Sequence, residues 1–310
     1  MSLPMHIADP VADAVAAKVP VVALESTIIT HGLPAPRNLE TALAVEATVR
    51  ERGAVPATIA VLDGVLHIGL DGRALTTLSR AKDVLKLSRA DLATALVQRA
   101  TGSTTVAATM IAAHLAGIEV FATGGIGGVH QGAETSFDIS ADLQELSLTA
   151  VTVVAAGAKA ILDVPKTLEH LETLGVPVIG YGTDIFPAFW SRDSGLPCPI
   201  RLDEPAAIAA SHRMRGALGL AGGQLVANPI PLAAEIPAET MRPLIAEAQA
   251  HADATGVAGK TLTPFLLAQI LELSAGRSLE ANIALVLNNA ALAADIAVCL
   301  SHTYPEPPIS

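Results

Sequence analysis

The chain has 310 residues, is 51% hydrophobic but only 3% aromatic, and carries a formal net charge of −11. Ala, Val, Leu and Ile must therefore build the core, which is typical of α/β proteins with apolar strands and Ala/Leu-rich helices. The negative charge argues against nucleic acid as a main partner, because phosphate backbones are bound by clustered Lys and Arg. A small anionic substrate is not excluded, since local groups decide its binding.

Cysteine usage and hydropathy indicate the compartment. Cys198 and Cys299 are the only cysteines and form no CxxC motif, so we expect neither a disulfide framework nor a zinc site. The N-terminus has no basic segment leading into an apolar stretch, and no run of about 18 uncharged apolar residues predicts a membrane span. We expect a soluble, cytoplasmic protein with no membrane partner.

The first predicted strand ends at a carboxylate. A short helix is expected over residues 9–18, followed by the apolar strand Val21–Leu24 and then Glu25. In open α/β folds, ligands bind at the carboxyl ends of strands, so Glu25 is a candidate site residue. A helix cap or a surface ion pair would explain this carboxylate as well.

The next segment predicts a helix and a hairpin. Asn38 is the expected N-cap of a helix over residues 39–52. A strand over 58–62 leads through Asp63-Gly64, a strong hairpin signal, into Val65–Ile68. His67 lies within this hairpin, where a structural role is favoured over a ligand role.

Two segments before residue 120 are candidate anion sites. Lys86 precedes a helix expected over residues 92–99 and can reach a phosphate, although isolated lysines are mostly solvated. Residues 102–106 open a helix that extends to Ala116. Small hydroxyl residues after a glycine make an anion cradle at a helix start, but they equally serve as ordinary N-caps.

A glycine-rich turn follows the strand Val120–Ala122. The sequence of residues 123–130 is TGGIGGVH, in which four glycines in five positions allow the backbone to approach a ligand or turn sharply. It is not GxGxxG, and no acidic residue follows at dinucleotide spacing, so we exclude a Rossmann cofactor site.

Acidic residues cluster after the turn. Asp138 and Asp142 share a face if this segment is helical, and together with Glu134 and Ser140 they suit a hard ion such as Mg²⁺ or Mn²⁺. Ser140 can instead be an N-cap with Asp142 in the first turn, and a solvated acidic helix start explains the pattern as well.

Lys159 follows the next predicted strand, over residues 148–156. At the start of a helix and between apolar neighbours, its ammonium form would be disfavoured, which lowers the pKa of the amine. A neutral amine is what a Schiff-base nucleophile requires. A surface lysine whose aliphatic stem packs on apolar groups is the alternative.

The C-terminal half continues the alternation of strands and helices. Loop 184–199 holds the single Trp, two Phe and three Pro, which favours a lid or an interface. The GKT of residues 259–261 is not a P-loop, because Ala254 stands where the first glycine is required. We find no repeat or linker and predict a single domain over 1–310. The remaining predicted elements are helices over 165–174, 204–214, 237–251, 263–273 and 278–297, and strands over 176–181 and 222–229.

Several long motifs resemble the pseudouridine-5′-phosphate glycosidase family, also called the indigoidine synthase A-like family. They run in order over nearly the whole chain. The matching motifs are ALESTIITHGLP (23–34), KLSRADL (86–92), GSTTVAATM (102–110), FATGGIGGVHQGAETSFDISADL (121–143), AAGAKAILD (155–163), YGTDIFPAF (181–189), ANPIP (227–231) and GKTLTPFLL (259–267).

The resemblance implies a layered α/β/α fold with a central mixed, largely parallel sheet. It also implies reversible cleavage of the C–C glycosidic bond of pseudouridine 5′-phosphate to uracil and ribose 5-phosphate, in pseudouridine catabolism. Members of the family use a divalent ion, commonly Mn²⁺, and form homotrimers.

The resemblance also assigns roles to residues. Lys159 would be the nucleophile that forms an imine, Glu25 the proton donor, and Asp138 the metal ligand, partly through water. The substrate would be bound by Lys86, Val106, Ser140, Ala141 and Asp142, with Thr123, His130 and Asn282 lining the pocket.

Two other functions remain to be distinguished. Residues 256–267 loosely resemble the glycine loop of a sugar kinase, but Lys260-Thr261 follow Gly259 where a catalytic Asp is expected, which disfavours phosphotransfer. A non-catalytic sugar-phosphate binding protein would bind the ligand without releasing uracil.

Overall fold

The computed structural model describes residues 2–257 and 259–302, and this part of the chain forms an 11-stranded sheet. The strands are β1 (Met5–Ile7), β2 (Val21–Leu24), β3 (Val55–Leu62), β4 (Val65–Ile68), β5 (Leu85–Leu87), β6 (Gly102–Thr104), β7 (Val120–Ala122), β8 (Thr152–Ala155), β9 (Val178–Tyr181), β10 (Ile200–Leu202) and β11 (Gln224–Ala227).

Helices connect most of these strands. They are α1 (Asp9–Ala16), α2 (Arg37–Glu51), α3 (Gly72–Arg80), α4 (Leu92–Val97), α5 (Val106–Leu115), α6 (Ala133–Ser136), α7 (Ala141–Leu148), α8 (Val164–Thr173), α9 (Pro205–Ala217), α10 (Ala238–Thr255), α11 (Leu262–Leu273) and α12 (Arg277–Ser301). Short turns of other helix types are η1 (Ile28–Gly32), η2 (Leu232–Ala234) and η3 (Gly259–Thr261).

The sheet is mixed and largely parallel, which confirms the predicted fold class. Its order is β1-β4-β3-β2-β7-β8-β11-β9-β10, with β6 pairing both β3 and β5. The pairs from β3–β2 through β9–β10 are parallel, whereas β3 is antiparallel to β4 and β6. The β3–β4 pair is the hairpin that Asp63-Gly64 predicted. Because β2, β7 and β8 are parallel neighbours, their carboxyl ends meet at one edge.

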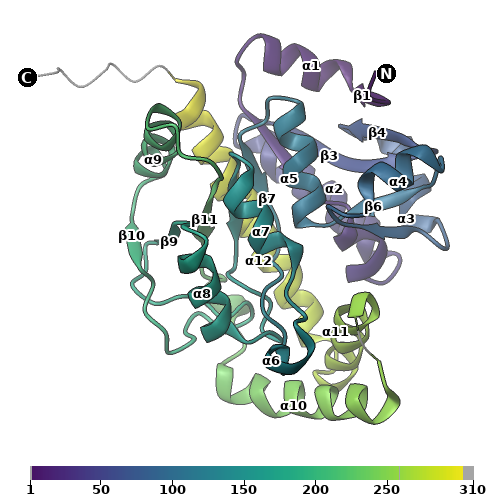
Figure 1. The fold of residues 1–310 in the computed structure, drawn as a ribbon, viewed down its shortest axis with the longest axis vertical. Helices are drawn as coiled ribbons and strands as arrows, with labels where there is room; N and C mark the ends of the chain where they lie inside the picture. The colour runs from purple at the N-terminus through teal and green to yellow at the C-terminus, as the bar shows by residue number, and fades with distance from the viewer. Residues whose placement is uncertain (1, 258, 303–310) are drawn as a thin grey trace, which may run out of the picture.

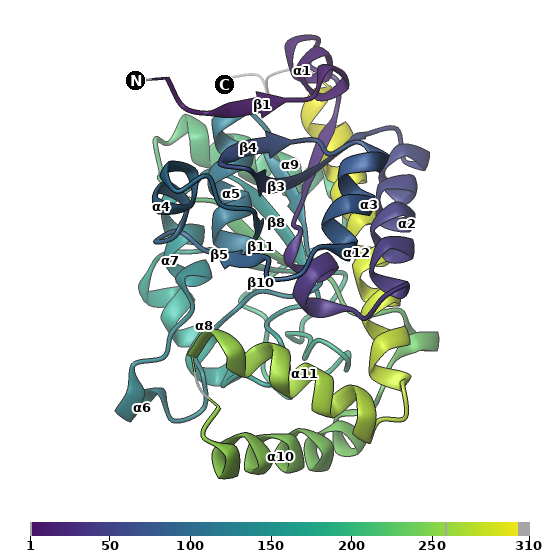
Figure 2. The ribbon, with the colours of Figure 1, turned by 90° about the vertical axis from the view of Figure 1, so that its right-hand side faces the viewer.

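Helices cover both faces of the sheet (Figures 1 and 2). Helix α12 crosses one face and packs on β2, β7 and β8 with α2 and α9 beside it, while α5 packs on the other face. Helices α10 and α11 lie side by side at one end of the molecule in both views. Ala, Val, Leu and Ile supply most of the continuous core, as the composition predicted.

Some predicted boundaries are wrong. The N-cap of α2 is Pro36, and Asn38 lies inside the helix, where its side-chain amide donates to the carbonyls of Ile29 and Ser79. The strand predicted over 148–156 begins only at Thr152, because α7 extends to Leu148. An apolar run alone does not separate the end of a buried helix from a buried strand.

Among the described residues, one helix, α12, is long and apolar enough to cross a membrane by length and composition. Half of its most apolar window is buried within the fold, and Asp295 on this helix forms an ion pair with Arg52. Its packing on β2, β7 and β8 accounts for its apolar face, so α12 has the surroundings of a core helix.

Candidate active site

A pocket of about 600 Å³ lies at the carboxyl ends of the parallel strands. It brings together residues that are far apart in the sequence, and α11 and α12 complete its wall. The lining residues come from the β2–α2 connection (Glu25, Thr27, Ile28, His31, Gly32, Leu33), from β5 (Lys86), from the turns after β7 and β8 (Gly124, Gly125, Lys159), from the β9–β10 loop (Phe189) and from α11 and α12 (Thr263, Pro264, Leu267, Asn282, Leu285).

Glu25 is held in place by two hydroxyl groups. Thr27 donates to one carboxylate oxygen, and Thr123, which follows the neighbouring strand β7, donates to the other. Thr123 is buried and does not line this pocket, although it lines a smaller adjoining pocket together with Glu25. The alternatives of a helix cap or a surface ion pair for Glu25 are therefore wrong, since the carboxylate faces a pocket.

Lys159 enters the pocket from the turn after β8. The expectation that it begins a helix is wrong, because α8 begins at Val164 with Asp163 as its N-cap. Instead, the backbone fixes Lys159. Its N–H donates to the carbonyl of Ile126 (3.1 Å), and the preceding residue, Ala158, forms a parallel β-bridge with Ile126. The glycine-rich turn therefore sets the position of Lys159.

Lys86 and His31 line the pocket close to each other. Burial, and next the charge of Lys86, lower the pKa of His31, while a hydrogen bond to the backbone of Val84 acts in the opposite direction. The imidazole Nδ1 lies 2.6 Å from the Thr30 hydroxyl and 3.2 Å from that of Ser103. A neutral His31 is thus held against β6, beside a lysine that can meet an anionic group.

Asp142 organises the glycine-rich turn rather than pointing into the pocket. Its carboxylate accepts from the backbone N–H of Gly127 (2.8 Å) and from that of Ala107 (2.9 Å) in the first turn of α5. Ser140 is the N-cap of α7 and accepts from the N–H of Asp142. This confirms the predicted alternative in which Ser140 caps a helix and Asp142 lies in its first turn. A Cβ on Gly127 would lie 2.2 Å from the Ser140 hydroxyl, so the glycine allows this close packing.

The predicted anion cradle before α5 is largely occupied by the protein itself. Thr105 is the N-cap, and the Ala107 N–H is taken by Asp142. Val106 is buried in the core and is not part of the pocket wall. Ala141 is the first residue of α7 and directly precedes Asp142. Any contact of residues 106 and 140–142 with a ligand would therefore involve their backbone or the Ser140 hydroxyl.

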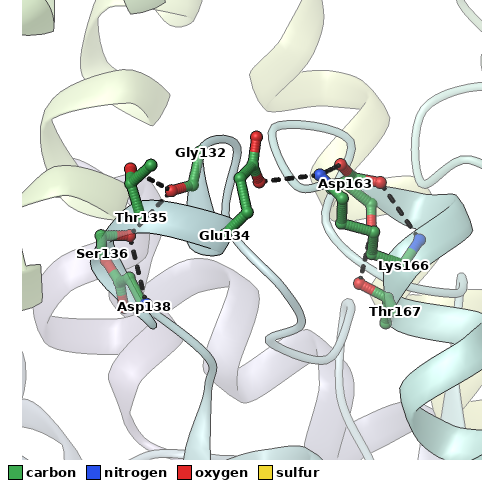
Figure 3. A network of polar contacts seen from close by, with 8 residues as sticks. All are labelled: Gly132, Glu134, Thr135, Ser136, Asp138, Asp163, Lys166 and Thr167. Atoms are coloured by element: carbon green, nitrogen blue, oxygen red, sulfur yellow. Dashed lines mark hydrogen bonds and ion pairs between the residues drawn. The ribbon is translucent and has the colours of Figure 1, made fainter.

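The acidic residues of the 134–142 segment do not share one site. Glu134 on α6 points toward Lys166 of α8 (2.9 Å), which also pairs with Asp163, whereas Asp138 lies at the other end of the short helix beside Ser136 (Figure 3). The shared helical face predicted for Asp138 and Asp142 is wrong, because α6 ends at Ser136 and α7 begins at Ala141.

Asp138 is close to the pocket through His130. The His130 N–H donates to the Asp138 carbonyl (3.0 Å). Burial lowers the pKa of His130, the Asp138 carboxylate raises it, and the charges of Lys159 and Lys86 lower it. His130 therefore lies within electrostatic reach of both pocket lysines, although it is not itself part of the wall.

Among the described residues, no three His, Cys, Asp or Glu side chains converge to hold a metal ion. A single half-exposed carboxylate, Asp138, still fits Mg²⁺ or Mn²⁺, which are commonly held by one or two carboxylates while water and substrate oxygens complete the shell. The donor set does not fit zinc, which takes several N or S ligands.

Aromatic side chains of the β9–β10 loop are buried, not exposed as in an open lid. Phe186, Phe189 and Trp190 are all buried, and Phe189 lines the pocket. A Cβ on Gly125 would lie 2.7 Å from the Phe189 ring, so the glycine-rich turn and this loop pack directly on each other. Asn282 of α12 also lines the pocket, where the family resemblance placed it.

The pocket residues that sequence reasoning missed include Thr27, His31 and Phe189. All three lie inside motifs that the resemblance covers. Thr27 and His31 follow Glu25 in ALESTIITHGLP, and Phe189 is the last residue of YGTDIFPAF. For Phe189 the signal was the concentration of aromatic residues in its loop, which predicted a lid or an interface. No pattern indicated that the imidazole of His31 would lie beside Lys86.

Comparisons with known proteins identify the family of this chain. Residues 10–299 match the family described as indigoidine synthase A like protein. A protein of Jannaschia sp. (strain CCS1), named pseudouridine-5′-phosphate glycosidase, is 66% identical over 301 residues, covering 97% of this chain and 100% of the relative. A protein of Paracoccus denitrificans (strain Pd 1222) with the same name is 68% identical over 290 residues, covering 93% and 95%.

Solved structures share the fold over nearly the whole chain. The prealnumycin C-glycosynthase AlnA, determined in complex with ribulose 5-phosphate, has a TM-score of 0.89 at 38% identity and covers 97% of this chain and 98% of its own. An indigoidine synthase A-like protein from Thermotoga maritima has a TM-score of 0.88 at 33% identity, covering 97% of both chains. Match length, identity and fold agree: this chain belongs to the indigoidine synthase A-like family.

Proposed function

We propose that the protein is a pseudouridine-5′-phosphate glycosidase, which reversibly cleaves the C–C glycosidic bond to give uracil and ribose 5-phosphate. The observation that carries the proposal is that Glu25, Lys86 and Lys159, from three separate segments, line one pocket. The names of the relatives and the ribulose 5-phosphate complex of a structural neighbour support a phosphorylated sugar or nucleoside as the substrate.

The bond to be broken explains why the pocket needs a lysine. An ordinary glycosidase protonates a leaving oxygen with one of two carboxylic acids. In pseudouridine the leaving atom is the C5 carbon of uracil, which has no lone pair to protonate. An amine bonded to C1′ solves this problem, because its nitrogen lone pair can form C=N as the C–C bond breaks.

The steps can be assigned to the two groups. The Lys159 amine bonds to C1′ as the C1′–O4′ bond breaks, and the proton that the nitrogen loses balances the one that the ring oxygen takes up. The C1′–C5 bond then breaks, C=N forms at C1′, and the Glu25 carboxyl delivers a proton to uracil C5. Water hydrolyses the imine to ribose 5-phosphate and the free amine. Thr27 and Thr123 keep the Glu25 carboxyl oriented toward the pocket.

Lys86 is proposed to bind the phosphate. It lines the same pocket as Lys159, and a point charge on a flexible stem suits a phosphoryl group. The neutral state of His31 limits the positive charge of this side to the lysines. The backbone at Ser140, Ala141 and Asp142 is proposed to add hydrogen bonds to the substrate.

Asp138 is proposed to hold Mn²⁺, or another divalent ion such as Mg²⁺. When bound, the ion would supply a fixed positive charge and ordered water beside the acidic segment. The position of Asp138 beside His130, which lies within electrostatic reach of both pocket lysines, supports this proposal. By family resemblance we further propose that the protein is cytoplasmic and forms a homotrimer. Sedimentation analysis of the purified protein tests the oligomeric state.

Release of uracil from pseudouridine 5′-phosphate, measured with and without added Mn²⁺, tests the proposal. We expect uracil and ribose 5-phosphate in equal amounts, and higher activity with the ion. A sugar-phosphate binding protein would bind the compound without releasing uracil. ATP consumption dependent on ribose or pseudouridine would instead support a kinase, although Gly259 here follows a helix, α10, rather than the strand that a P-loop requires.

A further inference from the structure

The β9–β10 loop places two aromatic rings side by side, one in the pocket wall and one behind it. The rings of Phe189 and Trp190 pack edge to face with centroids 5.0 Å apart. Phe189 has a φ of +61°, in the left-handed region that non-glycine residues rarely adopt. This conformation sends neighbouring rings to different places: Phe189 to the pocket wall and Trp190 to the interior, where it is 1% exposed.

Backbone bonds fix this pair. The Phe189 N–H donates to the carbonyl of Ala156 (3.0 Å), at the end of the strand that leads to Lys159. The carbonyl of Trp190 accepts from the N–H of Ile236 (2.9 Å), and Ser191 donates to the carbonyl of Ile236 (2.7 Å). These bonds fix the backbone that carries the two rings.

The indole N–H points at Asn282. Trp190 Nε1 lies 2.6 Å from Asn282 Oδ1. An indole nitrogen is only a donor, so the amide atom that it meets must be the oxygen. Among the described residues, no hydrogen-bond partner for Asn282 Nδ2 lies within the chain, and Asn282 lines the pocket. The amide thus keeps its N–H donors for a ligand.

We propose that Trp190 is a positioning residue that fixes the Asn282 amide as a donor, so that the pocket selects a base with a carbonyl oxygen at that place. This inference rests on the proposed function, and it assigns base selection to a residue that does not touch the base. Without the indole N–H, the amide can rotate and present an acceptor as readily as a donor. Phe189 supplies the flat apolar surface beside it.

The chain allows a sharp test, because Trp190 is its single tryptophan. Production in a tryptophan auxotroph supplied with 3-benzothienylalanine replaces the N–H with sulfur at this one position and preserves the shape of the ring system. Protein labelled with 4-fluorotryptophan is the matched control, because it retains the N–H. Near-identical circular dichroism and melting temperatures establish that both proteins fold.

Two measurements separate positioning from a general structural role. In the direction of synthesis, ribose 5-phosphate is combined with uracil, 2-thiouracil or 4-thiouracil, since sulfur is a weaker acceptor than oxygen. We expect the unmodified protein to prefer uracil over one thio compound by about tenfold, the value of one well-made hydrogen bond, and the benzothienyl protein to lose most of that preference. Trapping of ribose 5-phosphate alone by borohydride should be unchanged.

Each outcome decides the inference. Equal preference in the unmodified and benzothienyl proteins overturns it, as does an equal loss in the 4-fluorotryptophan control. A matching loss of trapping would indicate a merely structural role and also overturns it. If the unmodified protein releases no uracil, the proposed function fails separately. The affinity of the Lys159→Ala protein for pseudouridine 5′-phosphate, with and without the indole N–H, then decides the role of Trp190, with a roughly tenfold weakening expected.

Discussion

The pocket and the acidic segment of residues 134–142 contrast in how sequence distance relates to spatial distance. Glu25, Lys86 and Lys159 are far apart in the chain and line one pocket. Glu134, Asp138 and Asp142 are close in the chain and have three different surroundings: a surface ion pair, a half-exposed loop and a buried pair of backbone amides.

The difference comes from the sheet. Parallel strands bring their carboxyl ends to one edge, so the connections after β2, β7 and β8, which carry Glu25 and Lys159, converge whatever their separation in sequence. Lys86 reaches the same pocket from β5, which pairs with β6 beside β3. The acidic segment instead contains a short helix bounded by left-handed residues at Gly132 and Phe137. Each change of direction sends the next side chain elsewhere, so proximity in sequence does not produce a common site.

Replacement of Lys159 tests the convergence of the pocket most strongly. We expect Lys159→Ala to reduce uracil release by about 10³-fold or more, because no other amine can take over the covalent step. Borohydride with ribose 5-phosphate should add mass to the native protein and not to this variant. Lys166→Ala, which removes an exposed lysine of similar position along the chain, is the control and should retain activity and trapping. Equal trapping in both variants would mean that Lys159 is not the nucleophile.

Glu25→Gln separates the proton transfer from the covalent step. Turnover should decrease by roughly 10²- to 10³-fold, since a general acid contributes about that much. Adduct formation with ribose 5-phosphate should persist, because Lys159 is intact. Glu280→Gln, at an exposed ion pair with Arg37, serves as the control. Normal turnover in Glu25→Gln would remove this residue as the acid.

Asp142→Asn tests whether the Asp142 carboxylate has a structural rather than a catalytic role. The amide can accept only one of the two backbone N–H groups, so we expect a loss of roughly 1–3 kcal/mol in the free energy of unfolding. Urea denaturation measures this change. The control, Glu134→Gln, lies in a surface ion pair and should leave the denaturation midpoint unchanged. A fully stable Asp142→Asn protein that lacks activity would instead place this carboxylate in the chemistry.

The smallest effect concerns the charge of Asp138 on His130. The carboxylate raises the pKa of His130 against burial and the two lysines, so Asp138→Asn should lower that pKa further. Histidine titration by NMR measures the shift; an unchanged or higher pKa would contradict the contact.

Linkage fixes the sign of the accompanying change in stability. Because the pKa of folded His130 lies below the ordinary value of 6.5, the unfolded chain takes up the proton first as the pH falls. The free energy of unfolding is therefore unaffected above about pH 6.5 and decreases on acidification through the lower, folded pKa. Asp138→Asn should extend this decrease to lower pH.

Residues with a local signal were predictable. The apolar run of β2, the Asp63-Gly64 turn and the N-cap at Ser140 each depend on a few adjacent residues, and the structure confirms them. The prediction that Lys159 stands at the start of a helix was wrong, since the turn continues to Asp163 and the helix begins at Val164. Asn38 failed similarly, because its amide bonds to carbonyls from distant segments instead of capping a helix.

By itself, the sequence determined the α/β class, the order of most strands and helices, and the family, because these depend on periodicity, turn residues and long motifs. Only the tertiary structure decided which polar residues meet. It placed Thr123 against Glu25, His31 beside Lys86 and Trp190 against Asn282. Each of these contacts joins segments whose approach is set by sheet order and helix packing, and no local pattern in the chain encodes that approach.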